Sequence, residues 1–138
     1  VGQRQMCIRD RIERLKGKGT RNRTRQALRD VLEQCWRLDE IGLDHGELSR
    51  APKHIIVDKD EKTYIVDFET ASIQRRTSNV TSMCQYLFIG SKTAKTIQRK
   101  LGKINQQTLK TDLKNYKQNR TRENFNKILH LCKLASRP

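Results

Sequence analysis

Apolar residues recur at spacings of three and four along most of the chain, a pattern typical of a mainly helical protein. The clearest case begins near Thr24 and continues to Gly42, a residue that readily adopts the left-handed conformation that ends many helices. The positions that share its apolar face are Leu28, Val31, Leu32, Cys35, Trp36 and Leu38. We therefore expect a long amphipathic helix over 24–42, with one face against the core.

Four more helices are predicted in the second half of the chain, over residues 78–90, 91–101, 108–117 and 121–132. Ser or Thr stands at or near the start of each, where its side chain can accept a hydrogen bond from the first turn. Gly90 and Gly102 follow the first two helices and provide their C-terminal stops. The second half is therefore expected to be entirely helical.

Two runs rich in β-branched residues, 55–57 and 63–66, interrupt the helical pattern. Asp58, Asp60 and Glu61 lie between them and are expected to be solvated turn residues. The runs predict a β-hairpin, although the connection lacks the Asn-Gly or Asp-Gly pair of the tightest turns. Because both runs are almost continuously apolar, we expect the strands to be covered on both faces, or nearly so.

Candidate chemistry lies around this hairpin. His54 precedes its first strand and Asp67 follows its second, so the hairpin should bring these two side chains together. His45 and Glu47 occupy the loop before the hairpin, which can carry Glu47 to the same place. Two carboxylates beside an imidazole suit phosphoryl transfer, in which one carboxylate accepts a proton from the attacking hydroxyl and another holds a metal.

The motifs at these positions resemble those of the protein-kinase superfamily, in particular its small atypical RIO-like and KEOPS-type members. The sequence His-Gly-Glu-Leu-Ser at 45–49 is similar to the H-G-D-L loop of small kinases, and Asp-Phe-Glu at 67–69 is similar to D-F-G. Much of the chain from Thr24 onward also resembles predicted archaeal serine/threonine protein kinases, which carry the same variants. The resemblance implies the C-terminal lobe of a protein-kinase-like fold.

The resemblance also implies an activity and its site residues. It implies transfer of the γ-phosphate of ATP to a protein hydroxyl, with Mg²⁺ or Mn²⁺ as cofactor. Glu47 would be the catalytic base, His45 the histidine that supports the loop, and Asp67 a metal ligand. His54 corresponds best to the asparagine that helps to bind a second metal ion. Small atypical kinases act on ribosome or tRNA machinery, so a protein substrate of that kind is expected.

Each departure from the kinase pattern has a physical consequence. Glu47 is longer than Asp by one methylene, which moves the carboxylate by roughly 1.5 Å unless the loop retreats. A misplacement of about 1 Å can lower a rate about a hundredfold. The imidazole of His54 is a poor Mg²⁺ ligand, because this ion prefers oxygen. A pseudokinase with the same fold and a scaffold role is therefore an alternative.

The N-terminal part of the chain is interpreted separately. Residues 6–11, Met-Cys-Ile-Arg-Asp-Arg, resemble an in-frame translation of a sequencing-library adapter, so 1–11 are expected to be non-native. Residues 12–23 are interpreted as a basic linker and 24–138 as the kinase-like lobe. Neither a Gly-rich strand–loop–strand nor a strand lysine is recognised, so the ATP-gripping lobe is expected to be missing and this fragment alone inactive.

Composition adds a second alternative. The 138 residues include 30 Lys and Arg against 15 Asp and Glu, a net charge of +15. Such an excess favours anionic partners, and a nucleic-acid-binding module that uses the basic segments 21–29 and 92–103 remains open. The four widely spaced cysteines support neither a disulfide framework nor a zinc site. With no secretory signal or apolar run long enough for a membrane, a cytoplasmic location is expected.

Overall fold

The computed structural model describes residues 6–15, 19–49 and 52–135. In these residues the fold is mainly helical and contains a three-stranded antiparallel sheet in the order β1-β2-β3. The strands are β1 (Met6–Cys7), β2 (Ile55–Val57) and β3 (Thr63–Ile65), and η2 (Pro52–His54) is a short 3-10 helix before β2. The helices are α1 (Ile8–Arg14), α2 (Thr20–Ile41), α3 (Asn79–Phe88), α4 (Lys92–Leu101), α5 (Gln106–Gln118) and α6 (Arg122–Leu131). The predicted helical class and the hairpin are both confirmed.

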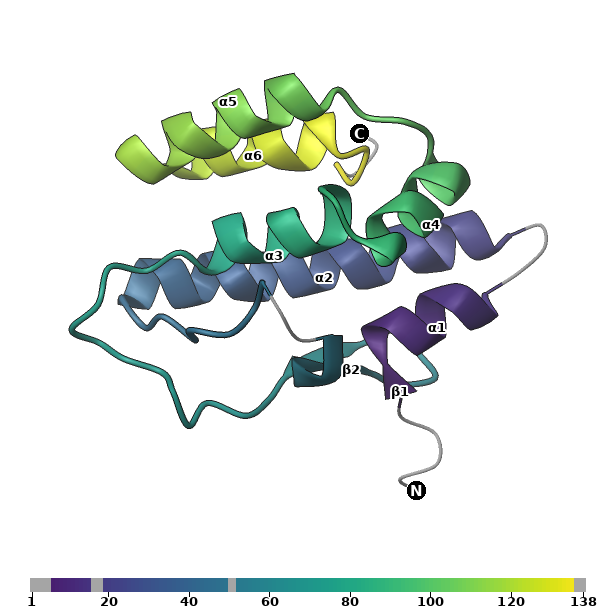
Figure 1. Cartoon of the computed structure of the whole chain (residues 1–138), viewed down its shortest axis with the longest axis horizontal. Helices are drawn as coiled ribbons and strands as arrows, with labels where there is room; N and C mark the ends of the chain where they lie inside the picture. The colour runs from purple at the N-terminus through teal and green to yellow at the C-terminus, as the bar shows by residue number, and fades with distance from the viewer. Residues whose placement is uncertain (1–5, 16–18, 50–51, 136–138) are drawn as a thin grey trace.

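The long helix α2 runs through the centre of the molecule beside α3 (Figure 1). The hairpin of α5 and α6 covers this pair on one side, and α1 with the small sheet lies on the other. Helix α4 packs beside the N-terminal half of α2 and against α1. The loops that flank the sheet are therefore attached to a rigid helical layer.

The core forms where the apolar stripe of α2 meets α3 and α6. Leu28, Leu32 and Cys35 are fully buried, and the ring of Trp36 stacks on Phe125 with a centroid distance of 5.4 Å. Each aliphatic side chain buried in this way contributes about 1.5–3 kcal/mol. Cys84 and Cys132 are buried beside these residues, as their positions on apolar stripes predict.

Most predicted helix boundaries are close to those observed. Gly42 ends α2 with a φ of 82°, and Ser91 caps α4 by accepting a hydrogen bond from the Ala94 amide at 2.8 Å. Thr121 caps α6 in the same way, accepting from the Asn124 amide at 3.1 Å. Helix α5 begins two residues before the predicted Thr108, because the side chain of Asn105 provides its cap.

The structure differs from the sequence-based prediction at the N-terminal segments. Helix α1 extends to Arg14 and α2 begins at Thr20, so the described part of 12–23 is largely helical rather than a linker. Within the expected non-native segment, β1 pairs with β2 and Ile8 is fully buried. That residues 1–11 are non-native stays a prediction, because packing does not reveal the origin of a segment. Residues 1–5 and 16–18 lie outside the described residues.

Two predictions about the hairpin are wrong. Glu61 is not a solvated turn residue: its side chain is buried and forms an ion pair with Arg11. Strand β3 is not covered on both faces, since Tyr64 is 43% exposed. One residue of β3 is therefore exposed to solvent. No helix in the described part of the chain is both long and apolar enough to cross a membrane.

Candidate functional site

The open end of the hairpin brings His54 and Asp67 together. Ile55 pairs with Ile65, and the Val66 amide donates to the His54 carbonyl at 2.9 Å, so pairing continues one step past the strands. Asp67 comes next, with its Oδ2 atom 3.3 Å from Nδ1 of His54. The predicted proximity of these two side chains is therefore present, and it follows directly from the strand register.

Glu47 reaches the same point from the loop that follows α2. Its Oε2 atom lies 3.9 Å from Nε2 of His54, and one ligand atom from each of Glu47, His54 and Asp67 lies within 4.8 Å of the other two. The His54 side chain is only 4% exposed, whereas those of Glu47 and Asp67 are 37% and 43% exposed. The cluster thus has a buried imidazole behind two carboxylates that are accessible from solvent.

His45 is not a member of the cluster, but its ring holds the Glu47 loop in place. It is fully buried, and its Nε2 atom lies 2.8 Å from the Val66 carbonyl oxygen, which can only accept. Nε2 therefore carries the proton, and Nδ1 accepts from the Glu47 amide at 3.3 Å. Because both ring nitrogens contact the backbone, His45 ties the Glu47 loop to the residue just before Asp67.

The backbone at Asp67 turns sharply out of the sheet. Asp67 has a φ of 65°, a left-handed conformation that aspartate tolerates better than most residues. The next residue, Phe68, places its ring edge-on against His45, with 4.8 Å between the ring centroids. The turn directs the Asp67 carboxylate toward His54 while Phe68 packs on the histidine that supports the loop.

A buried polar network missed by the sequence analysis fixes the loop to α3. Asn79, at the start of α3, accepts a hydrogen bond from the His45 amide at 2.8 Å. Its side-chain nitrogen donates to Asp39 at 2.9 Å and to the Leu43 carbonyl at 2.8 Å. Asp39 also accepts from the Tyr116 hydroxyl at 2.7 Å. The signal for Asp39 was available, because this acid lies on the apolar face of its helix, four residues after Cys35.

The electrostatics of this network keep the Tyr116 hydroxyl protonated. Burial and the hydrogen bond to Asp39 raise the pKa of Tyr116, so the phenol remains a neutral donor. The Asp39 carboxylate is itself buried, and its partners satisfy both oxygens: Oδ1 accepts from Asn79, and Oδ2 accepts from Tyr116. A satisfied buried network of this kind holds one geometry, because any displacement leaves a polar group without a partner.

Two further contacts position Glu47 and its loop. The Thr70 hydroxyl donates to Glu47 Oε2 at 3.1 Å, which orients that carboxylate. Asp44 accepts from Nε of Arg75 at 2.7 Å and from the Ser78 amide at 2.9 Å. Asp44 and Ser72 also exchange backbone hydrogen bonds. These contacts join the Glu47 loop to the segment between the sheet and α3.

The donor atoms of the cluster fit a divalent cation. The carboxylates of Glu47 and Asp67 are the oxygen ligands that Mg²⁺ and Mn²⁺ use. The imidazole of His54 suits Mn²⁺ or a later transition metal better than Mg²⁺. Its two nitrogens face different carboxylates, so one can coordinate a cation while the other faces the remaining acid. The chemistry of the donor set thus favours Mn²⁺ over Mg²⁺.

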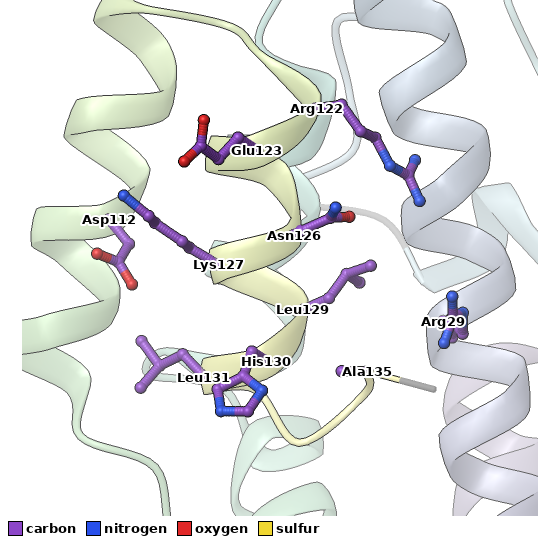
Figure 2. A pocket seen from close by; sticks show the side chains of 10 residues that line it. All are labelled: Arg29, Asp112, Arg122, Glu123, Asn126, Lys127, Leu129, His130, Leu131 and Ala135. Carbon is purple, nitrogen blue, oxygen red and sulfur yellow. The ribbon is translucent and has the colours of Figure 1, made fainter. Parts of the chain in front are cut away.

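A cavity lies elsewhere, among α2, α5 and α6 (Figure 2). It has a volume of about 760 Å³, and its lining includes cations such as Lys127 and anions such as Asp112 and Glu123. None of the cluster residues lines it. Because cavity size alone does not provide reacting groups, we regard the carboxylate–imidazole cluster as the candidate site.

Fold and site together define a mainly helical protein with a small antiparallel sheet and a carboxylate–imidazole cluster at the open end of a hairpin. No protein-family model matches the chain. Over 81 residues the chain is 33% identical to the uncharacterized protein MJ1211 of Methanocaldococcus jannaschii, a match that covers 59% of this chain and 68% of that protein. The chain belongs to the same family as this archaeal protein.

Proposed function

We propose that the chain is the C-terminal lobe of a small protein-kinase-like phosphotransferase that transfers the γ-phosphate of ATP to a protein hydroxyl. The observation that supports this most strongly is the convergence of Glu47, His54 and Asp67 within 4.8 Å at the end of the hairpin. The loop order H-G-E-L and D-F-E supplies the kinase resemblance, and the proximity of Glu47 and Asp67 supports the roles that the resemblance implies for them.

The residues have distinct roles in this proposal. Glu47, oriented by Thr70, accepts the proton of the attacking hydroxyl. Asp67 and His54 hold a divalent cation, which neutralises charge on the phosphates when bound. His45 is a positioning residue, since both of its ring nitrogens contact backbone groups.

In this proposal the nucleotide is bound mainly by a separate lobe. A kinase needs a Gly-rich loop over the phosphates and a strand lysine that pairs with them. Neither motif is recognised in these 138 residues. ATP turnover is therefore expected only when that lobe is present, with a ribosome- or tRNA-associated protein as the expected class of acceptor.

A scaffold without catalysis is the second candidate, and one observation favours it. The buried ring of His54 lies between the two carboxylates, 3.3 Å from Asp67 and 3.9 Å from Glu47. An imidazole in this position can contact both carboxylates directly, so the cluster can keep its arrangement without a metal. In the phosphotransferase the cluster must take up a cation and support turnover, whereas the scaffold requires neither.

Calorimetric titration of the full chain with Mn²⁺, followed by Mg²⁺, tests the proposal. We expect Mn²⁺ to bind at a single site, and Asp67→Ala to weaken this binding by at least about tenfold. Glu69→Ala is the matched control, because Glu69 is an exposed acid two residues away and outside the cluster. Equal binding by both variants would exclude the metal site and with it the phosphotransfer proposal.

A second measurement separates enzyme from scaffold. ATP turnover is assayed with a version of the protein that includes the nucleotide-gripping lobe, and Glu47→Ala is compared with Glu69→Ala. Loss of turnover in the first variant alone supports Glu47 as the base. Metal binding without any turnover, and no difference between the two variants, would favour the scaffold.

A further inference from the structure

A second surface feature lies on the α5 side of α3, away from the carboxylate–imidazole cluster. A groove of about 400 Å³ runs between these helices and is lined by Thr81, Gln85, Ile89, Lys110, Leu113, Lys114 and Lys117. We call it the α3–α5 groove. None of the residues that line this groove belongs to the candidate site. The proposed function therefore assigns no role to the groove.

The charge of the groove has one sign. Lys110, Lys114 and Lys117 are exposed and lie on one face of α5 at spacings of four and three residues, about 6 Å and 4.5 Å along the helix axis. None of the described residues that line the groove is acidic. The groove therefore presents three ammonium groups in a row without a local counter-charge.

The surrounding sequence strengthens this positive field. From Thr70 to Thr111 the chain contains eight Lys and Arg residues and no Asp or Glu. This stretch supplies all of α3 and α4 and the start of α5. Arg76 lies at the end of the groove, where its guanidinium donates to the Lys117 carbonyl. Several kT of positive potential are typical of such a surface and attract polyanions.

Several arginines outside the groove are engaged within the protein. At the N-terminal end of α2, Arg21 donates to the Lys100 carbonyl at 3.0 Å, and Arg25 donates to the Lys133 carbonyl at 2.8 Å. In the cavity of Figure 2, Arg122 is held by Glu33. The α3–α5 groove differs from these sites because its three exposed lysines line an open groove that an external anion can enter.

We propose that the α3–α5 groove binds the phosphodiester backbone of a nucleic acid. The three lysines contact successive phosphates, and the Thr81 hydroxyl and Gln85 amide provide neutral donors to phosphate oxygens. Ile89 and Leu113 supply an apolar floor against which sugars pack. No aromatic side chain lines the groove, so stacking on bases is not expected and binding depends little on sequence.

The test measures binding of the full chain to labelled duplex RNA, duplex DNA and single-stranded RNA as salt is varied. The triple variant K110Q/K114Q/K117Q is compared with K92Q/K95Q/K103Q, which removes the same charge from the exposed side of α4 and its C-terminal loop. Thermal unfolding of both variants checks that they remain folded. The variants differ only in where the three charges are lost.

We expect the groove variant to bind duplex DNA at least about tenfold more weakly at 0.1 M salt, with the slope of log K against log[salt] reduced by about 2.7 for three lost phosphate contacts. The α4 variant should retain most of its affinity and slope. The proposal is wrong if both variants lose affinity equally, or if the α4 variant alone is weakened. It is equally wrong if polyglutamate of similar length competes as well as nucleic acid, because the groove would then select charge and not phosphodiester. The preferred nucleic acid among the three probes identifies the class of partner.

Discussion

Removing the Asn79 side chain provides the sharpest test of how the Glu47 loop is held. Asn79→Ala deletes the acceptor of the His45 amide and the donor to both Asp39 and the Leu43 carbonyl. A hydrogen bond to a charged group contributes about 1.5–3 kcal/mol and a neutral one about 0.5–1.5 kcal/mol. One charged and two neutral bonds therefore predict a loss of about 4 kcal/mol in the free energy of unfolding.

This loss is a large part of the roughly 5–15 kcal/mol that stabilises a domain of this size. It can be measured by urea denaturation, followed through the fluorescence of Trp36, which is the single tryptophan and lies in the core. Asn126→Ala is the matched control, because Asn126 is exposed on α6, and its loss should change stability by less than about 0.5 kcal/mol.

Hydrogen exchange at the His45 amide adds a local readout. In Asn79→Ala this amide loses its acceptor, so its exchange should accelerate by more than the global loss of stability accounts for. If the variant loses less than about 1 kcal/mol, or if the His45 amide keeps its protection, the network does not hold the loop and the reasoning fails.

Two further predictions concern stability and thiol access. Arg122 donates two hydrogen bonds of 2.6 Å to Glu33 and lowers the pKa of that carboxyl below 4.5. Glu33→Gln should therefore lose about 1 kcal/mol at pH 7. Because the pKa of Glu33 is lower in the folded state, the ion pair stabilises the protein above the ordinary pKa of glutamate, and this stability is lost as pH falls through the folded-state pKa. The difference in unfolding free energy between the parent protein and Glu33→Gln should therefore be smaller near pH 3 than at pH 7. A difference that does not change with pH would contradict the ion pair. Of the four cysteines only Cys7 is not buried, and burial raises the pKa of the Cys35 thiol. A thiol reagent should accordingly titrate about one equivalent in the native protein and four in urea, and rapid reaction of more than one native thiol would show that the core is looser than described.

The hairpin part of the site was predictable because strand pairing is a short-range rule. His54 and Asp67 flank two β-rich runs, and antiparallel pairing must bring such flanks together. The position of Glu47 was less certain, since a loop can leave a helix in many directions. It depends on the hydrogen bonds of Asn79 with His45, of Thr70 with Glu47 and of His45 with Val66, which join residues 34, 23 and 21 apart in the chain.

Helices α2 to α6, the caps at Ser91 and Thr121 and the hairpin were determined by the sequence alone, because they depend on periodicity and on contacts within a few residues. Only the tertiary structure decided that Asp39 and Glu61 are buried, because a carboxylate is buried only where distant donors such as Tyr116 and Arg11 meet it. Only the tertiary structure also showed that three lysines of α5 border a groove against α3. A periodic pattern identifies which face of a helix is polar, but which element packs beside that face depends on contacts far apart in the sequence.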